Sequence, residues 1–491
     1  MNIKSSLKNL ASDSVIYGLS GVLTKFISLF LTPLYTRIFT PDDYGVIGIL
    51  ANGYVFITIL LVFAMDNSTA RWFYDTESFH HRKQIINTWF WFYLVLSLGS
   101  AILLFFSAHY WAQMFLPEYA DSYLYIRLIA LTLVFVVLPS VATNILRFER
   151  KPKSAVFLSL FQALSLIFFN VLYVLLLKWG IVGVYYAQLS SVIFTLPLAI
   201  YLIKYWIGSP KWFTLQKFKE MVSYALPFIP ASIGFWVVNL SGVFFLNEYV
   251  TKNEVGLFQI GISIAAVAGI ATMAFQQAWS PFSFSILNQK NSKEIYAAAF
   301  TFYVLGIGFL CTIISLFAYE ALIILTTPLY YGASLVAGIL VFNYFLMGLT
   351  NIAGLGASIA KKTAPLGTIS LISSAILISL NFLLIPYYGK EGAALAICFA
   401  QLIIPLYMFR KSQKYFFIPY DFKKNILVLL SFVVCVIVSI ILKHDNFFLS
   451  ILIKLALLSI TSAIVFYLNK EDLIKIKVIL YKKFNSAVPQ R

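Results

Sequence analysis

The stretch GLSGVLTKFISLFLTPLY, residues 18–35, decides the fold class, because it is almost entirely apolar and nearly long enough to cross a membrane. A hydrocarbon core about 30 Å thick needs roughly 20 apolar residues in one helix. Similar runs recur along the whole chain, and they are continuous, whereas the strands of a β-barrel would alternate. We therefore predict an all-α polytopic membrane protein with about 14 transmembrane helices. The predicted spans are 14–38, 43–65, 85–107, 122–145, 154–177, 182–203, 221–246, 255–278, 296–316, 333–358, 363–384, 391–409, 425–442 and 448–468.

The composition agrees with this reading. Of the 491 residues, 61% are hydrophobic and only 11% are charged. Soluble domains carry about 25% charged residues, so a soluble fold is excluded. The loops between the predicted spans are too short to hold a soluble catalytic domain, so any activity must lie inside or across the membrane.

The net charge of +17 is explained by where the basic residues lie. With the N-terminus placed in the cytoplasm, 28 of the 36 Lys and Arg residues fall in cytoplasmic segments and five in outer loops. Cytoplasmic loops carry such an excess in helical membrane proteins. We therefore predict a multi-pass protein of the bacterial cytoplasmic membrane, with both termini cytoplasmic and membrane lipids as partners, and no nucleic-acid partner.

No metal or cofactor is predicted. The three cysteines all fall within predicted spans, which argues against disulfides and metal clusters. His80 and His81 share a cytoplasmic loop with Asp75 and Glu77, where metal binding is open but a solvated loop is favoured. The four histidines form no catalytic cluster, so no catalytic residue is assigned.

The chain repeats itself after six spans. Residues 40–45, TPDDYG, match residues 251–256, TKNEVG, as T-x-x-[DE]-x-G. Because six is an even number, the two halves have the same orientation, which is an arrangement of parallel repeats found in transporters. The predicted parts are 1–220 (spans 1–6), 221–424 (spans 7–12), 425–468 (spans 13 and 14, without counterparts) and 469–491 (a basic cytoplasmic tail).

Lys25 is the most unusual residue of the first span. It lies about 13 residues into the helix, or roughly 20 Å from the cytoplasmic end, too deep for its amine to reach either surface. A central lysine costs at least about 2.5–3.5 kcal/mol on insertion scales. Small and polar residues share its face at helical spacing, namely Gly18, Gly21, Ser28, Thr32 and Thr36. We expect this face to line a hydrated cavity in which Lys25 binds an anion.

Other polar residues within spans extend the candidate substrate-binding set. They are the cations Arg37 and Arg127 and the amides Asn52, Asn239, Gln276 and Asn343. Hydrogen bonding between helices is the alternative role for each amide. Lys454, near the outer end of the last span, is expected to snorkel to the outer surface. No Asp or Glu lies centrally in a predicted span, and Asp66, near the inner end of span 2, is the candidate for coupling to an ion.

Residues 12–50, SDSVIYGLSGVLTKFISLFLTPLYTRIFTPDDYGVIGIL, resemble the opening of the Wzx-type oligosaccharide flippases of the polysaccharide transporter family. The most specific element runs from Pro33 to Gly45. The family belongs to a superfamily with the multidrug (MATE) exporters and the peptidoglycan precursor flippase. The fourteen-span layout extends the resemblance along the chain, more loosely after the second span.

The resemblance implies two six-helix bundles around a cationic cavity, in a MATE-like fold. It implies a transporter that carries an undecaprenyl-diphosphate-linked oligosaccharide to the outer leaflet by alternating access, for O-antigen, capsule or exopolysaccharide. Polymerases and glycosyltransferases of the same pathway are implied partners. Lys25 matches the diphosphate-binding role by position. Arg37 lies in the shared run, and Arg127 matches only as a cation of the N-terminal half.

Three alternatives stay open at this point. A flippase for peptidoglycan or teichoic-acid precursors would handle the same kind of lipid anchor. A multidrug exporter is disfavoured, because the spans have no central carboxylate for ion coupling. A membrane glycosyltransferase or polymerase is disfavoured, because it would need catalytic acids or bases in a sizeable loop or in the cavity.

Overall fold

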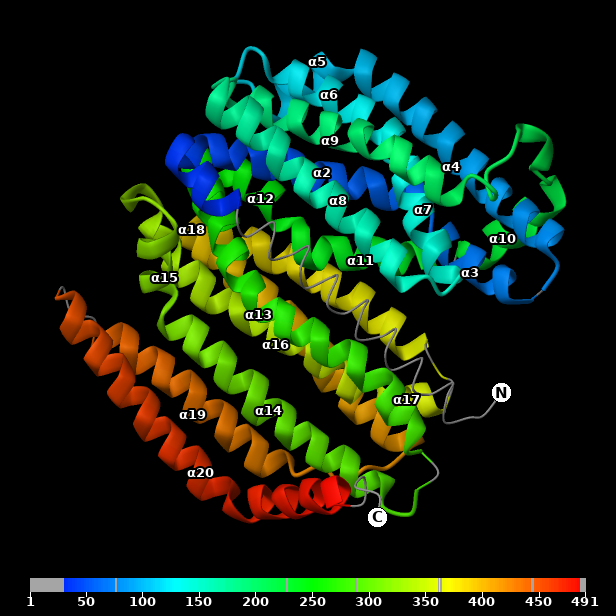
Figure 1. Ribbon diagram of the computed structural model, residues 1–491. Helices are drawn as coiled ribbons and strands as arrows, with labels where there is room; N and C mark the ends of the chain where they lie inside the picture. The colour runs from blue at the N-terminus through cyan, green and yellow to red at the C-terminus, as the bar shows by residue number, and fades with distance from the viewer. Residues whose placement is uncertain are drawn as a thin grey trace. The chain divides into compact units, whose positions relative to one another are not determined.

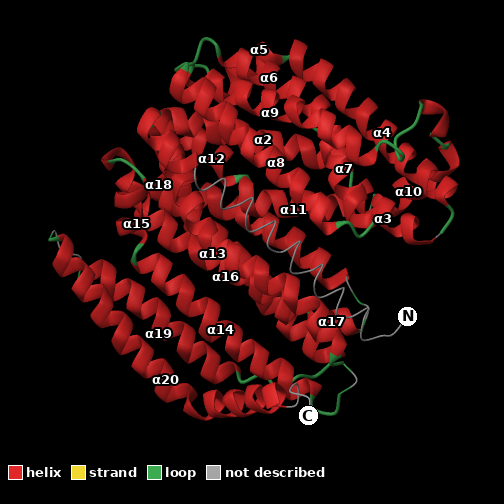
Figure 2. Ribbon diagram, in the orientation of Figure 1, coloured by secondary structure: helices red, strands yellow, loops and turns green. Residues whose placement is uncertain are grey.

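The computed structural model describes residues 31–75, 77–226, 228–287, 289–360, 362, 364–442 and 446–485. Lys25 and Ser28 lie outside these ranges, as does most of the predicted span 14–38. Within the described ranges every regular element is a helix and there is no strand (Figure 2). The all-α prediction is therefore confirmed.

The second span is a broken helix. Thr40 caps its start, since Asp43 N donates to Thr40 Oγ1 (3.3 Å) while Asp43 Oδ2 accepts from Thr40 N (3.0 Å), a reciprocal capping box. Helix α2 (Pro41–Val62) ends at Phe63 and Ala64, whose φ angles are 53° and 52°. Few residues other than glycine adopt such angles. Helix α3 (Met65–Asp75) follows directly.

The rest of the first half is a set of closely packed helices. They are α4 (Phe79–Phe106), α5 (Ala108–Phe115), α6 (Ser122–Phe135), α7 (Val137–Phe148), α8 (Pro152–Asn170), the π-helix η1 (Val171–Leu176) and α9 (Gly180–Ile203). Trp89 and Tyr93 of α4 lie in the core at 0% and 1% exposure, packed among buried residues of α3 and α7. Helices α8 and α9 lie side by side (Figure 1).

The second half contains three long helices, α13, α18 and α20, among shorter ones. It comprises η2 (Pro210–Trp212), α10 (Leu215–Ala225), α11 (Phe228–Leu240), α12 (Gly242–Tyr249), α13 (Lys252–Ser285), α14 (Ser292–Leu316), α15 (Ala318–Leu325), η3 (Pro328–Ala333), α16 (Ser334–Ala353), α17 (Leu355–Ile359), α18 (Ala364–Tyr415), α19 (Phe422–Ile441) and α20 (Phe447–Asn485). Helices α10 and α11 bend by 49° at their junction. This bent pair covers the predicted span 221–246 as far as Leu240, and the remainder falls on the start of α12.

In the described part of the chain, 11 helices are long and apolar enough to cross a membrane, or 12 if α10 and α11 form one span. The predicted number of fourteen is therefore not confirmed. One reason is α18, whose 52 residues would extend about 78 Å. Gly389 interrupts it with φ 49° and ψ −130°, and the predicted spans 363–384 and 391–409 lie on either side.

The chain forms two compact units. One comprises Met1–Ser263, Leu325–Gly332 and Ser370–Ala400, and the other comprises Ile264–Ile324, Ala333–Ile369 and Gln401–Arg491. The division into 1–220, 221–424, 425–468 and 469–491 stays a prediction.

In the second unit a buried ion pair joins α15 to α20. Lys454 Nζ lies 2.6 Å and 2.8 Å from the carboxylate oxygens of Glu320, and both residues are more than nine-tenths buried. The expectation that Lys454 snorkels to the surface is therefore wrong. A buried charge needs a partner, and this one finds it in another helix.

Candidate functional site

The two copies of the T-x-x-[DE]-x-G motif meet in the first unit, where α2 crosses α13 at their glycines. A Cβ atom on Gly45 would overlap the carbonyl oxygen of Lys252, and one on Gly256 would overlap the carbonyl oxygen of Pro41. The contact is reciprocal, because each glycine faces the residue that follows the threonine of the other copy. Only glycine allows main chains to approach so closely.

Polar side chains hold this crossing in place. Asn253 Nδ2 donates to Asp42 Oδ2 at 3.4 Å, which links the two motifs directly. Lys390 Nζ donates to both carboxylate oxygens of Glu254, at 2.8 Å and 2.9 Å. Lys252 Nζ donates to the Phe115 carbonyl at 2.9 Å. The crossing is thus tied to the Gly389 kink and to the end of α5, at the end of the molecule that the sequence predicts to be outside.

Further along α2, aromatic rings and amides lie between this helix and α11. Trp236 Nε1 donates to the Asn52 carbonyl at 3.2 Å, and the Trp236 ring lies 4.5 Å from that of Phe56 and 5.7 Å from that of Phe244. Asn52 itself is buried, and its amide donates to the Gly48 carbonyl at 2.8 Å. This bond lies within α2, so it is not the hydrogen bond between helices that is the alternative role for the amides, and binding of substrate by Asn52 stays a prediction. We call the contact of α2 with α11 the seam.

The seam ends in a pocket of about 300 Å³ at the break between α2 and α3. Its polar lining combines a carboxylate, a phenol, two hydroxyls and an amide, from Asp66, Tyr54, Thr58, Ser232 and Asn67. Asp66 lies in the first turn of α3, where the helix dipole favours a negative charge. Oxygen-rich sites of this kind suit hard cations. Within the described residues, no cluster of three or more His, Cys, Asp or Glu could hold a metal ion.

The structure brings together only part of the predicted set. Asn52 and Asn239 lie on the two helices of the seam, and Asn239 Nδ2 donates to the Phe235 carbonyl at 2.9 Å. Thr32 is 3% exposed, whereas Arg37 is exposed. Lys25 and Ser28, predicted on the same face as Thr32, lie outside the described residues.

Arg127 lies among aromatic rings of its own bundle. Its guanidinium is 4.9 Å from the ring of Phe105 and 5.1 Å from that of Tyr123, on which His109 stacks at 4.2 Å. Such cation–π contacts stabilise a charge that is partly removed from water. Binding of substrate by Arg127 stays a prediction.

Gln276 and Asn343 belong to the second unit. Gln276 lies on α13 and is half-buried, and Asn343 lies on α16 and is buried. The two helices pack together, since Trp279 Nε1 of α13 donates to the Asn351 carbonyl of α16 at 3.3 Å. Their part in binding also stays a prediction.

Sequence reasoning missed Trp236, Phe56 and the pocket at Asp66. The pocket depends on the left-handed residues Phe63 and Ala64, and neither type of residue signals a helix break. Trp236 and Phe56 look like ordinary lipid-facing residues in an apolar run. Only the repeated motif indicated that α2 had a structural counterpart.

Comparisons with known proteins agree with this architecture. The sequence profile of a family described as "Polysaccharide biosynthesis protein" matches residues 10–287. No curated protein matches the chain. The structure is similar to that of "Lipid II flippase MurJ, inward closed conformation", with 16% identity, a TM-score of 0.73, and coverage of 94% of this chain and 100% of that one.

Multidrug transporters also share the fold. An inward-facing multidrug resistance MATE family transporter of the MOP superfamily has 15% identity and a TM-score of 0.65, over 83% of this chain and 97% of that one. A mutant of the Vibrio cholerae MATE transporter VcmN has 17% identity and a TM-score of 0.60, over 84% and 97%. At these identities the likeness is one of fold, and it confirms the predicted MATE-like architecture.

Proposed function

We propose a function from one premise, which is that the chain belongs to the polysaccharide biosynthesis protein family. The protein is a flippase that moves undecaprenyl-diphosphate-linked oligosaccharide units across the cytoplasmic membrane by alternating access, for a surface polysaccharide. The family description supplies the pathway. The fold shared with a lipid II flippase and with multidrug transporters supports the transport of a large amphipathic molecule.

The reciprocal contact of Gly45 and Gly256 carries the proposal. The head group of a lipid-linked sugar cannot cross hydrocarbon, because each desolvated polar group costs several kcal/mol. A protein that replaces the water around this head group must close its transport path at one end while the path is open at the other. The contact between matching motifs from the two sequence halves supplies such a closure at one end.

In this proposal the chemistry of each polar or aromatic residue determines which part of the substrate or which ion it binds. Lys25 receives the diphosphate, since an ammonium in a poorly solvated site attracts phosphate oxygens, and Arg37 attracts the same group at the outer end. Trp236 and Asn239 of the seam contact the sugar. The pocket at Asp66 takes up the coupling cation, a sodium ion or a proton.

A crosslink between the motifs tests whether the closure must open. Asp42 and Asn253 are joined by a hydrogen bond, so cysteines at both positions are close enough to be bridged by a short crosslinker. We expect the crosslinked protein to stop exporting polysaccharide and to recover when a cleavable crosslink is cut. Each single cysteine variant is the control. Full export with the crosslink in place would contradict alternating access through this end.

Lys25 provides the test of substrate class. In a deletion strain, Lys25→Ala should lower surface polysaccharide and leave undecaprenyl-linked units facing the cytoplasm, whereas Lys25→Arg should restore part of the function. Lys204→Ala, at the cytoplasmic end of α9, is the matched control. Full activity of Lys25→Ala at equal expression would remove this residue from the mechanism.

A lipid-linked peptidoglycan precursor is the second candidate substrate. It is favoured by the similarity to the lipid II flippase, which extends over the whole of that chain. Deletion separates the two, because arrested peptidoglycan synthesis would favour the precursor, whereas loss of surface polysaccharide with normal growth would favour the oligosaccharide.

A further inference from the structure

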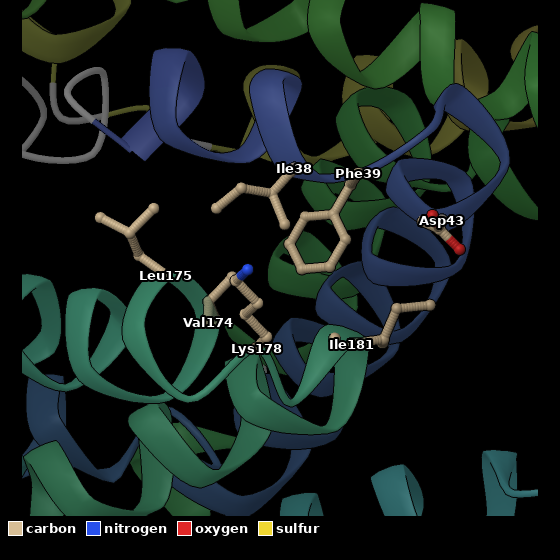
Figure 3. Close-up of a pocket in the computed structure, with 8 residues that line it drawn as sticks. Ile38, Phe39, Asp43, Val174, Leu175, Lys178 and Ile181 are labelled. Atoms are coloured by element: carbon tan, nitrogen blue, oxygen red, sulfur yellow. The ribbon is translucent and has the colours of Figure 1, made fainter.

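A second pocket, of about 380 Å³, lies in the first unit beside the start of α2 and is separate from the seam. It is lined by Ile38, Phe39, Asp43, Val174, Leu175, Lys178, Gly180 and Ile181 (Figure 3). Its volume falls within the range of about 300–1,000 Å³ that small-molecule sites occupy. The lining is mostly apolar but includes one cation and one anion.

An irregular turn produces this pocket. The π-helix η1 ends α8, and the next residues reverse the chain through Lys178 and Gly180, whose φ angles are 56° and 62°. A lysine in the left-handed region is uncommon and is strained unless its surroundings impose it. Here Trp179 stacks on Tyr173 with ring centroids 4.8 Å apart, and Trp179 N donates to the Tyr173 carbonyl at 3.0 Å. These two contacts stabilise the turn.

The Lys178 side chain enters the pocket. Its amine is directed to the side where Ile38 and Phe39 lie (Figure 3). None of the ion pairs formed among the described residues includes Lys178. An ammonium in mostly apolar surroundings attracts an anion, and a phosphate oxygen is a suitable acceptor.

Asp43 contributes the opposite charge at the far side of the pocket, beyond the Phe39 ring (Figure 3). Its two intramolecular bonds to Thr40 both use Oδ2. The negative charges of Asp43 and Asp42 also act on the hydroxyl of Tyr119, in the loop before α6. Burial raises the pKa of the Tyr119 hydroxyl to about 12, with Asp43 and Asp42 contributing in the same direction. A ligand with a positive group fits this end.

The surroundings of the pocket are those of a lipid-facing surface. Leu175, Leu176 and Leu177 are 43%, 66% and 46% exposed, and Trp179 is 44% exposed. Tryptophan and tyrosine gather at the level of the lipid head groups in membrane proteins. Tyr173, Trp179 and Tyr186 form such a group of contacting rings.

We propose that this pocket binds a phospholipid whose head group carries a primary ammonium, as in phosphatidylethanolamine. The phosphate binds Lys178, the ammonium faces Asp43, and an acyl chain lies against the exposed leucines after Val174. The pairing of one cation with one anion favours this zwitterion over an anionic lipid, whose net charge Asp43 would repel. The proposed site is separate from the seam and from the pocket at Asp66.

Native mass spectrometry of the full chain in detergent tests the site, with phosphatidylethanolamine, phosphatidylcholine and phosphatidylglycerol of equal acyl chains. We expect the ethanolamine lipid to bind about tenfold more tightly than the choline lipid, a difference of about 1.4 kcal/mol. A trimethylated ammonium has no N–H to donate to Asp43. Asp43→Asn, whose side-chain oxygen can still accept from Thr40 N in the capping box, should remove this preference.

Lys178→Gln should weaken binding of the ethanolamine lipid about tenfold. Lys178→Gly should do the same while it relieves the left-handed backbone, so loss of binding by a well-folded glycine variant assigns the effect to the amine. Lys204→Gln is the matched control and should bind as the unmodified protein does.

Four results would overturn the proposal. They are equal binding of ethanolamine and choline lipids, unchanged binding by both Lys178 variants, displacement by inorganic phosphate alone, and displacement by a polyprenyl diphosphate at lower concentration than the phospholipid. The last of these would assign the pocket to the cargo. Loss of polysaccharide export in a variant that binds the phospholipid normally would concern the proposed function and not this lipid site.

Discussion

The two copies of the T-x-x-[DE]-x-G motif have the same backbone role but use their acidic residues differently. In the first copy Asp43 turns back to Thr40 and completes a local cap, with bonds of 3.0 Å and 3.3 Å. In the second copy Glu254 N still donates to Thr251 Oγ1, at 3.4 Å, but its carboxylate binds Lys390, 136 residues away.

The difference shows which part of the motif the architecture requires. Both glycines are needed, because each admits a carbonyl oxygen of the other copy where a Cβ would lie. The acidic position makes the close approach of the main chains in neither copy, although the Glu254 carboxylate ties the crossing to Lys390. It stabilises the start of its own helix in one copy and anchors the kink at Gly389 in the other.

Breaking the crossing should give the largest effect. In Gly256→Ala the new Cβ would overlap the Pro41 carbonyl oxygen, a main-chain atom that no rotamer change can move. We expect the free energy of unfolding in detergent to fall by about 3 kcal/mol. The crosslink between cysteines at Asp42 and Asn253 should also form more slowly. Gly45→Ala should behave similarly.

Gly99→Ala is the control for this substitution. A Cβ on Gly99 of α4 would meet no atom within 4 Å. Because alanine favours helices more than glycine, this variant should gain about 0.5–1 kcal/mol. Equal stability of Gly256→Ala and Gly99→Ala would show that the two helices do not approach as described.

Removing the long-range ion pair should have a smaller effect, confined to the second copy. Glu254→Gln loses a partly buried pair, and we expect a cost of about 1–2 kcal/mol. A double-mutant cycle of Glu254→Gln with Lys390→Met should show a coupling energy of about 1 kcal/mol. The same cycle with Asp43→Asn should show none. Coupling of Asp43 with Lys390 would remove the distinction between the two acids.

Removing the threonine hydroxyls that cap α2 and α13 should give the smallest difference in stability between the two copies. Thr40→Ala removes the two bonds of the Thr40 hydroxyl, the one it accepts from Asp43 N and the one it donates to Asp43 Oδ2, and should cost about 1 kcal/mol. Thr251→Ala should cost only a few tenths, since its one side-chain bond is long and Glu254 is engaged elsewhere. Thermal unfolding of both variants, with Thr→Ser at each position as the control that keeps the cap, measures the difference. A larger loss at Thr251 would reverse the comparison.

Local patterns in the sequence were sufficient for the fold class, because the length of an apolar run follows directly from membrane thickness. The repeated motif also identified the two helix starts that correspond. Its glycines did not show that the copies touch each other, since close approach is a property of two segments 211 residues apart.

Contacts between distant segments account for the rest of what was missed. Lys454 is paired with Glu320 on another helix. Glu320 lies near the end of its own span, and nothing in the local sequence shows that Lys454 is its partner. The pocket at Asp66 arises from a helix break at Phe63 and Ala64, two residues that favour helices or strands elsewhere. The apolar periodicity of the sequence gives no sign of a break at these two residues.

The crossing of α2 and α13 has one more consequence. Where Gly45 and Gly256 meet, the touching atoms belong to the main chain, and peptide groups neither gain nor lose protons in the range that cells encounter. Acidifying or diluting the medium would alter the surrounding ion pairs but leave these atoms unchanged. If the crossing is the closure proposed above, a barrier built in this way would resist leakage of small ions under conditions that would weaken one made of charged side chains.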